Sequence, residues 1–533
     1  MFPGVAGAVL DELLERALNV VSRLRLSYCA VPSEPESPVS IVILNFSTPH
    51  SFLLLLALSL TACAENEEPS EPDEANVTAG PAGGSGSEAA PIKNVILISV
   101  DTIRADHLQL YGYDRETSPF LRSLGNRAVV FDKAISQAPW TLPSHAVMFS
   151  SDYPTALGLG NWSNQRPIPS DAVLLAEVLR RTGMRTVGIV DAGFVSRVFG
   201  FGRGFETYDE SDTRTVDQSV DGFLEWVDAL DEGENYFAFL HTYDVHDYDP
   251  PGSAKKKLVT PYKGPLRGKN VAQILQDHSK RNIVSQFGAA DKVYVQDLYD
   301  AGIFAVDRQL RRLFRELEST GKLDETLVVI TSDHGEEFFE RGWTGHGYTL
   351  FDENLRVPLL FVHPSLPTRR VSEQVRLLDL APTILDLLGL EIPESWRGES
   401  LGPLIDGEAA TGRIAFSEHN HGRARFSVRE GDWKVIQAIE NGQIRFFNLE
   451  DDPAELLSLT GRGHQAEERL RTELAAWREE NDARKARLTL ESIEVDPELA
   501  EQLRLLGYTG VSDGEGGNQD DEGGKKGEDD DDQ

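Results

Sequence analysis

Runs of apolar and β-branched residues, separated by helical patterns, constrain the fold of this chain more than any other feature. The first run, Asn94–Val100 (NVILISV), is almost continuously apolar, which is typical of a strand buried on both faces of a sheet. Similar runs follow at Thr186–Val190, Tyr236–Leu240, Leu327–Thr331 and Val357–Val362. Helical patterns alternate with them, at Ala172–Arg181, Ala301–Glu318 and Leu377–Leu388. This alternation predicts an α/β fold, an α/β/α sandwich with a mostly parallel central sheet and helices on both faces.

A smaller region follows from about residue 413. Its short segments Phe426–Arg429, Trp433–Ile436 and Ile444–Leu449 are separated by Gly and Asp turns, which predicts a small antiparallel sheet. Helical patterns come next, at Gln465–Arg487 and Pro497–Leu506. We therefore expect a main domain over residues 92–412 and a C-terminal subdomain with helices over residues 413–510.

The acidic character of the chain limits its partners. The formal net charge is -35 at pH 7, which argues against nucleic acid because phosphate backbones attract Lys and Arg. Residues 511–533 are rich in Asp, Glu and Gly and have almost no apolar residues. Such a composition predicts a disordered, solvated tail.

The N-terminal part resembles an export signal. Phe52–Leu60 (FLLLLALSL) is too short to span a bilayer, and the following LTAC ending at Cys63 resembles a bacterial lipobox. Residues 64–91 then have the composition of a tether. We expect residues 1–63 to be a signal segment of uncertain start, Cys63 to be lipidated, and the protein to be a periplasmic or cell-surface lipoprotein that meets the membrane only through this anchor. The alternative is an apolar segment that packs on the main domain, because the run begins far from Met1 and lacks a basic flank.

Acidic and imidazole side chains follow several of the predicted strands. Asp101 comes directly after the first strand, and Asp333 and His334 follow the run Leu327–Thr331. Further groups of this kind are His241, Asp244, His246 and His346. In α/β sheets, sites collect beyond the carboxyl ends of the strands. Carboxylates with imidazoles suit Zn or Mn, whereas an all-oxygen site would suit Ca or Mg.

The stretch Ala138–Ser150 (APWTLPSHAVMFS) starts an apolar helical pattern with polar residues. Thr141 could cap that helix, with Pro143 in its first turn, or it could be a nucleophile presented at a helix N-terminus. Asp101 could also be an ordinary helix cap. Capping does not explain why so many such groups follow several strands, so the sequence favours a catalytic site.

Residues from about 94 to 390 resemble the alkaline phosphatase superfamily, in its sulfatase-like branch. The resemblance is carried by NVILISVDTIRADHLQLYGY, VVITSDHGEEF, LRVPLLF and LLDLAPTILDLLGL, and in the smaller region by DWKVI and FFNLEDDPAE. It implies an alkaline-phosphatase-like fold and an ester hydrolase. The chain departs from typical sulfatases at Thr141–His145 (TLPSH), where those enzymes have Cys or Ser, two residues before Pro, oxidised to formylglycine. Threonine cannot form that aldehyde, so no formylglycine is expected.

The segment is instead similar to threonine-nucleophile members of the superfamily. That similarity implies two divalent ions, Zn or Mn with Ca as a further option, and a metal-activated Thr141. Asp101, Thr141, Asp333 and His334 would hold one ion. Asp244, His246 and His346 would hold the second, with His241 as an alternate ligand or a contact to the substrate.

The expected substrate is a small anionic ester. A sulfated threonine cannot release sulfate by elimination as a formylglycine hydrate does, which slightly favours phosphate or phosphonate esters over sulfate esters. Three alternatives stay open: sulfate-ester hydrolysis without formylglycine, phosphoryl transfer, and a non-catalytic anion-binding protein. The absence of several apolar spans favours hydrolysis over transfer.

Three weaker candidates surround this predicted site. Arg104 either acts in catalysis or braces the site through a salt bridge, and His145 could contact the charged oxygens of the substrate. Gly252–Lys269 (GSAKKKLVTPYKGPLRGK) is the one basic cluster of the chain. It either attracts an anionic substrate to the entrance or is a solvated loop.

Overall fold

The computed structural model describes residues 90–503 apart from 161–165, 212–213, 277–286, 343, 409–412, 421–423, 490–492, 494–496, 498 and 501–502. All the described residues fall in one compact unit, residues 85–533. Cys63, the acidic tail, nearly all of the expected tether and most of the helix expected at Pro497–Leu506 lie outside the described residues. No helix in the described part has the length and apolar composition needed to cross a bilayer.

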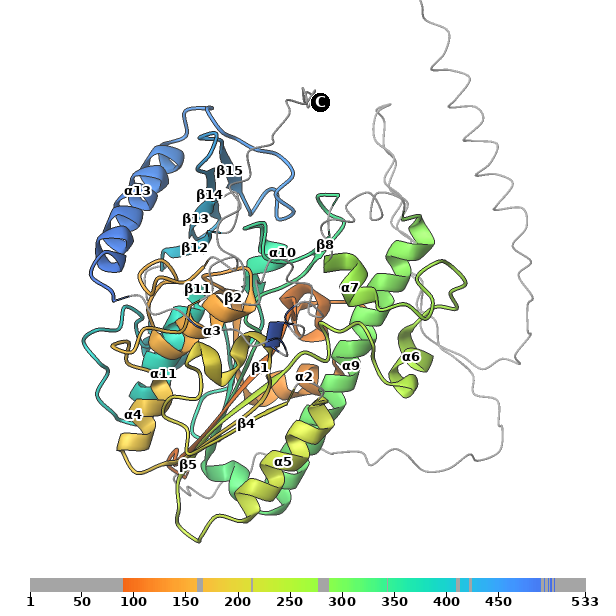
Figure 1. Cartoon of the computed structure of the whole chain (residues 1–533), viewed down its shortest axis with the longest axis vertical. Helices are drawn as coiled ribbons and strands as arrows, with labels where there is room; N and C mark the ends of the chain where they lie inside the picture. The colour runs from red at the N-terminus through yellow and green to blue at the C-terminus, as the bar shows by residue number, and fades with distance from the viewer. Residues whose placement is uncertain are drawn as a thin grey trace, which may run out of the picture. The chain divides into compact units, whose positions relative to one another are not determined.

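The central sheet has nine strands and is mostly parallel, which confirms the predicted fold class (Figure 1). Its order is β11 (Arg369–Arg376), β2 (Val129–Ile135), β10 (Leu359–Val362), β6 (Thr326–Thr331), β1 (Asn94–Val100), β5 (Tyr236–Thr242), β3 (Arg185–Asp191) and β4 (Thr207–Ser211), with β9 (Arg356–Val357) paired to β2.

One predicted strand differs from the structure. The run Val357–Val362 forms two short strands, β9 and β10, separated by Pro358. β10 is antiparallel to both of its neighbours, β2 and β6. A buried apolar run has the same composition in either direction, so the sequence did not distinguish these orientations.

Helices cover both faces of the sheet, and β1 shows why. Val95 and Leu97 belong to one hydrophobic cluster, whereas Ile96 and Ile98 belong to the other, because successive side chains of a strand point to opposite faces. The first cluster includes residues of α3 (Thr141–Ser150), α4 (Leu175–Arg181) and α11 (Leu380–Leu387). The second includes residues of α2 (Pro119–Leu124), α5 (Val216–Asp228) and α9 (Ala289–Ser319).

The predicted small antiparallel sheet is present. Its strands are β12 (Ala415–His419), β13 (Arg425–Glu430), β14 (Trp433–Ala438) and β15 (Ile444–Asn448), of which the sequence had not indicated β12. Helix α13 (Gln465–Lys485) packs on this sheet through Trp477, whose ring is stacked on Phe416 at 4.9 Å. The division of the chain into a main domain and a C-terminal subdomain stays a prediction.

Several short elements complete the described part. They are the helices α6 (Gly252–Leu258), α7 (Val271–Gln276), α10 (Asp352–Leu355) and α12 (Gly402–Asp406) and the strand pair β7 (Glu337–Phe338) and β8 (Thr344–Gly345).

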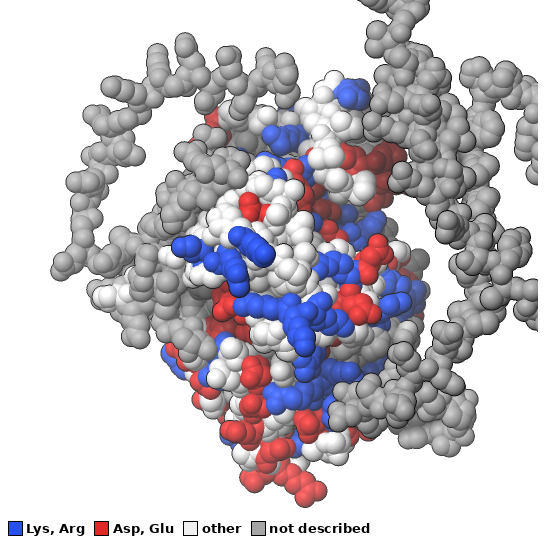
Figure 2. Space-filling view, turned by 90° about the vertical axis from the view of Figure 1, so that its right-hand side faces the viewer, with Lys and Arg blue, Asp and Glu red and all other residues white. Residues whose placement is uncertain are grey.

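The basic segment Gly252–Lys269 is helical in its first part, which forms α6. Lys255 pairs with Asp249, and Lys257 pairs with Glu116 at 3.1 Å. Figure 2 views the side of the molecule that carries α6 and α9 in Figure 1, and Lys and Arg gather on this face. The expected role of Gly252–Lys269 in attracting an anionic substrate stays a prediction.

Candidate active site

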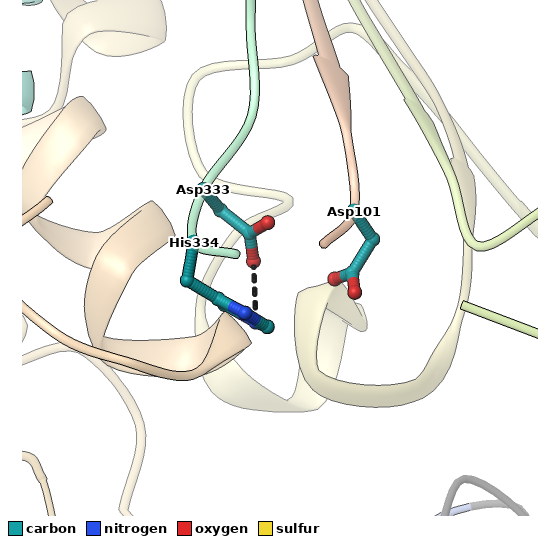
Figure 3. A group of neighbouring side chains, drawn as sticks. All are labelled: Asp101, Asp333 and His334. Carbon is teal, nitrogen blue, oxygen red and sulfur yellow. Dashed lines mark ion pairs between the residues drawn. The ribbon is translucent and has the colours of Figure 1, made fainter. Parts of the chain in front are cut away.

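Two neighbouring strands deliver three ligand-type side chains to one edge of the sheet. Asp101 directly follows β1, while Asp333 and His334 come just after β6, its parallel neighbour. All three side chains are fully buried. Figure 3 shows them converging, with the ion pair between Asp333 and His334 dashed.

This cluster has the geometry and chemistry of a cation site. One ligand atom of each of Asp101, Asp333 and His334 lies within 4.8 Å of the other two. Asp101 Oδ1 and both carboxylate oxygens of Asp333 have no hydrogen-bond partner among the described residues, although they are buried. Burying carboxylate oxygens that accept no hydrogen bond is costly unless a cation binds them, and the ion pair with His334 reaches only Oδ2 of Asp333. The residues therefore fit a divalent metal ion.

Thr141 adjoins this cluster as the first residue of α3. The N-cap is Trp140, so Thr141 lies in the first turn instead of capping the helix. Its hydroxyl donates to Asp101 Oδ2 at 3.1 Å and lies 3.4 Å from His334 Nε2. The structure therefore brings together the four residues expected around one ion. Ser144, one turn along α3, donates to the carbonyl of Asp333 at 2.6 Å and ties the helix to that loop.

The backbone after β1 is held in an uncommon conformation. Thr102 has φ of 61°, in the left-handed region that β-branched residues rarely adopt. The hydroxyl of Thr102 donates to the carbonyl of Asp101 at 2.8 Å, and the hydroxyl of Tyr299 donates to the carbonyl of Thr102 at 2.7 Å. These contacts hold the turn that directs Asp101 into the cluster.

The two carboxylates of the cluster have opposite pKa shifts. Burial, with the charge of Asp333, raises the pKa of Asp101 to about 8. Burial also acts to raise the pKa of Asp333, but the neighbouring His334 and His145 hold it below its ordinary value. Without a cation the pair therefore shares a proton at neutral pH, with Asp101 as its carrier, and cation binding would release that proton.

His145 and His241 are buried beside the cluster. Burial lowers the pKa of His145 to about 3 and that of His241 to about 4, so both imidazoles are neutral at pH 7. His241 Nε2 lies 3.8 Å from Asp101 Oδ2. The ring nitrogens of His145 are within 2.9 Å of the Thr141 carbonyl and of Ser99 Oγ, so His145 contacts the chain itself. These contacts favour a positioning role for His145 over the substrate contact expected from sequence.

A second group lies beside the first and contains a residue that the sequence analysis missed. The rings of His246 and His346 are 5.3 Å apart, and the ring of His346 is 4.4 Å from that of His334. His346 Nδ1 lies 3.3 Å from Oε1 of Glu336, whose side chain is fully buried. The signal for Glu336 was its place in the same strand-end segment, three residues after Asp333.

In the part of the chain that the structure describes, no hydrogen bond or ion pair joins the Asp244 carboxylate to His246 or His346. Asp244 Oδ1 accepts hydrogen bonds from the backbone N–H of Val216 at 3.1 Å and from the hydroxyl of Thr242 at 3.0 Å. Val216 is the first residue of α5, whose free N–H groups attract a carboxylate. The expected grouping of Asp244 with His246 and His346 is therefore not what the structure shows.

Arg104 braces the loop that carries His334 and Glu336. Its guanidinium pairs with Asp106 at 2.8 Å and with Glu340 at 2.5 Å, and it donates to the carbonyl of Glu336 at 2.9 Å. These contacts support the bracing alternative for Arg104, because they fix the segment that carries His334 and Glu336.

Two protein-family models match parts of this chain. The family model described as Sulfatase matches residues 93–390, more than half of the chain. The chain belongs to the sulfatase family. A second model, described as N-sulphoglucosamine sulphohydrolase, C-terminal, matches residues 340–480. The sulfatase family consists of ester hydrolases, and the alkaline phosphatase superfamily assignment is confirmed.

Individual relatives of this sulfatase-family chain are distant. Arylsulfatase K of Xenopus laevis is 23% identical over 431 residues, covering 70% of this chain and 80% of the relative. N-acetylglucosamine-6-O-sulfatase of Bacteroides thetaiotaomicron is 30% identical over 187 residues, 32% of this chain and 33% of the relative.

Solved structures share the fold. A protein solved with its substrate D-glucosamine-2-N,6-O-disulfate has a TM-score of 0.61 and 18% identity, covering 74% of this chain and 98% of that chain. The phosphonate monoester hydrolase of Agrobacterium radiobacter has a TM-score of 0.60 and 19% identity, covering 73% and 96%.

Proposed function

We propose that this sulfatase-family protein is a metal-dependent hydrolase of small anionic esters in which Thr141 is the nucleophile, with phosphate or phosphonate esters slightly favoured over sulfate esters. The observation that supports this best is the position of the Thr141 hydroxyl. It lies at a helix N-terminus, within 3.1 Å of Asp101 Oδ2 and 3.4 Å of His334 Nε2.

The residues that would hold a divalent ion, Zn or Mn with Ca as a further option, are Asp101, Thr141, Asp333 and His334. When bound there, the ion lowers the pKa of the Thr141 hydroxyl and polarises the ester oxygens.

The chain itself supplies the nucleophile and the environment of the reaction. The Thr141 hydroxyl gives its proton to Asp101 Oδ2, the oxygen that accepts its hydrogen bond. Thr141 Oγ1 then forms a bond to phosphorus or sulfur while the bond from that atom to the alcohol oxygen breaks on the opposite side, and the leaving oxygen takes a proton from solvent. The positive end of the α3 dipole, where Thr141 lies, favours the anionic group that is transferred.

Turnover needs a second displacement. Water attacks the phosphorus or sulfur atom of the threonine ester, and the bond to Thr141 Oγ1 breaks. Thr141 takes back the proton held by Asp101, and the attacking water gives a proton to solvent. Threonine carries one oxygen on Cβ, so its ester cannot collapse to an aldehyde, and direct attack by water is required. This requirement is the reason to favour phosphorus esters.

Proteins with a similar structure are named for sulfate esters and for phosphonate esters. Proteins of this fold include a 2-O GAG sulfatase and phosphonate monoester hydrolases. Sulfate-ester hydrolysis without formylglycine, phosphoryl transfer and anion binding without turnover are the alternatives to be tested.

The test follows nitrophenol release from four esters: an aryl sulfate, a phosphate monoester, a phosphate diester and a phosphonate monoester. The purified chain and Thr141→Ala are compared with Zn or Mn added. Turnover of a phosphorus ester that is lost in Thr141→Ala supports the proposal. Turnover of the sulfate alone would overturn the substrate preference, and no turnover by either protein would favour the anion-binding alternative.

We also propose that the protein is exported and anchored by lipidation at Cys63, on the sequence pattern alone. Labelled fatty acid should be incorporated by the wild-type chain and not by Cys63→Ser. Equal labelling of the two chains would contradict this anchor.

A further inference from the structure

The outer face of α9 carries a row of arginines. Arg308, Arg311 and Arg315 are spaced i, i+3 and i+7, so they lie on one face of the helix over about 10 Å. All three are exposed, and none of them forms an ion pair within the part of the chain that the structure describes. Arg308 donates to Ser253 Oγ at 3.5 Å, while Asp307, one turn before Arg311, accepts two backbone N–H groups of α2.

Helix α6 extends this row. It packs along α9, with Lys257 Nζ 4.7 Å from the centre of the Phe304 ring. Lys256, the preceding residue, is exposed and has no ion pair with a described residue. Figure 2 shows Lys and Arg gathered on the face that carries α6 and α9. The basic stripe is defined here as Lys256, Arg308, Arg311 and Arg315.

The basic stripe is not neutralised by the acidic residues of α9 and α5. Asp221 pairs with Arg312, at 2.5 Å. Glu318 pairs with Arg127. Glu316 lines a recess between α9 and α5. The chain as a whole has a formal net charge of -35, but charges are screened over about 10 Å at 0.1 M salt, so a ligand at α9 responds mainly to the stripe.

The chain enters the described domain beside the carboxyl end of α9. The backbone N–H of Lys93, just before β1, donates to the carbonyl of Glu325 at 2.9 Å, and Lys93 Nζ pairs with the Glu325 carboxylate at 2.7 Å. Glu325 follows shortly after α9, which ends at Ser319. Asp101 lies at the other end of β1, roughly 20 Å away along the strand. An anchor that precedes residue 90 would therefore connect next to α9, at the sheet edge opposite the Asp101 cluster.

We propose that the basic stripe docks on the anionic phospholipid headgroups of a membrane surface. Guanidinium groups bind phosphate through two parallel N–H···O bonds, and basic residues close to an anionic leaflet add to membrane affinity one by one. A lipid surface is favoured over a soluble polyanion because the chain enters the domain beside α9. The inference rests on the proposed anchor at Cys63, which would bring this face to a bilayer and raise its effective concentration there. The sequence alone had predicted membrane contact only through the anchor.

The test measures cosedimentation of the whole chain with lipid vesicles. The chain carries Cys63→Ser, so that no acyl chain contributes, and vesicles of phosphatidylcholine with and without phosphatidylglycerol are compared at about 0.1 M salt. Binding to the anionic vesicles should be tighter on the order of 100-fold, and high salt should abolish this preference. The preference should disappear in the triple variant Arg308→Gln/Arg311→Gln/Arg315→Gln.

A control removes the same charge from exposed arginines in and beside α13 that have no ion pair with a described residue. This control is Arg462→Gln/Arg471→Gln/Arg487→Gln, and it should keep the preference for anionic vesicles. Equal binding by the two triple variants, or equal affinity of the parent for both kinds of vesicle, overturns the proposal. Binding of a soluble sulfated polysaccharide through the stripe, without a preference for anionic vesicles, overturns the assignment to lipid.

Failure of this inference and failure of the proposed function give different results. Labelling with fatty acid tests the anchor at Cys63, and nitrophenol release tests hydrolysis, and neither measurement depends on the stripe. Loss of the vesicle preference with Cys63 labelling intact would remove the lipid contact and keep the anchor.

Discussion

The Thr141 hydroxyl donates a hydrogen bond of 3.1 Å to Asp101 Oδ2, and so joins the start of α3 to the end of β1. The two residues are 40 positions apart in the chain. The contact places Thr141, which stands where typical sulfatases have Cys or Ser, beside the candidate metal ligands. The role of this threonine can therefore be tested directly.

Replacement of Thr141 separates a nucleophile from a structural hydroxyl. Thr141→Ala should lower kcat/KM on the order of 10³-fold or more, because the attacking oxygen is lost. Thr141→Ser keeps that oxygen and should retain activity within about tenfold. Steady-state kinetics on the best ester of the four classes measures both effects. Equal activity of the Ala and Ser variants would remove Thr141 from the reaction.

The metal-free protein should lose stability as pH rises above neutrality. Burial is the main cause that raises the pKa of Asp101 from 3.8 and that of Glu336 from 4.5, each to about 8. The stability that such groups contribute is complete below the unfolded pKa and is lost as pH rises through the folded pKa. His246 has the same sign: burial lowers its pKa, but Asp247, Asp101 and Glu336 outweigh this and raise it to about 9.

The measurement is the Tm of EDTA-treated protein between pH 6.5 and 9. We expect Tm to fall, because the free energy of unfolding decreases by at most about 1.4 kcal/mol per pH unit for each group. Added Zn should reverse the fall. In this window His145 and His241 stay neutral in the folded protein. Their unfolded forms lose their protons near the ordinary pKa of 6.5, so their opposite effect on stability is confined to the lower end of the window. Asp101→Asn should flatten the slope, which separates this site from other buried acids such as Glu337. A Tm that rises with pH would contradict the assignment.

Gly335 is required by close packing of the loop that carries His334 and Glu336. A Cβ at this position would lie 2.0 Å from the backbone oxygen of Glu353. Gly335→Ala should therefore destabilise the protein by about 2 kcal/mol and weaken Zn binding, because the loop must shift. Urea unfolding and Zn titration measure these effects.

Gly252→Ala is the control for this loop. Nothing lies within 4 Å of a Cβ at Gly252, so the variant should be as stable as the wild type or slightly more stable. Equal behaviour of the two glycine variants would show that packing at Gly335 does not matter.

We expect Arg104 to stabilise the folded protein and to hold the loop that carries His334 and Glu336 in place. Arg104→Met removes a buried guanidinium from Asp106, Glu340 and the carbonyl of Glu336, which should cost about 3 kcal/mol. Arg127→Met is the comparison, because Arg127 and Glu318 form an exposed pair whose loss should cost less than about 1 kcal/mol. If Arg104→Met leaves the unfolding midpoint unchanged while kcat falls, a direct catalytic role would replace bracing.

The sequence was sufficient for the frame of the site. A strand buried on both faces, such as Asn94–Val100, must be continuously apolar, so it is visible without a structure. Asp101, Asp333 and His334 were predictable as a group because β1 and β6 are parallel neighbours whose carboxyl ends meet at one edge. The resemblance to sulfatases added the position of Thr141.

Only the tertiary structure decided where the remaining side chains bind. Asp244 binds the N-terminus of α5, His145 binds Ser99 and the Thr141 carbonyl, and Glu336 contacts His346. Position along the chain fixes which sheet edge a residue reaches when its strand is identified. It does not fix the direction of a side chain beyond the strand, because that depends on competing donors from segments distant in sequence, such as the free N–H groups of a helix that only folding brings near.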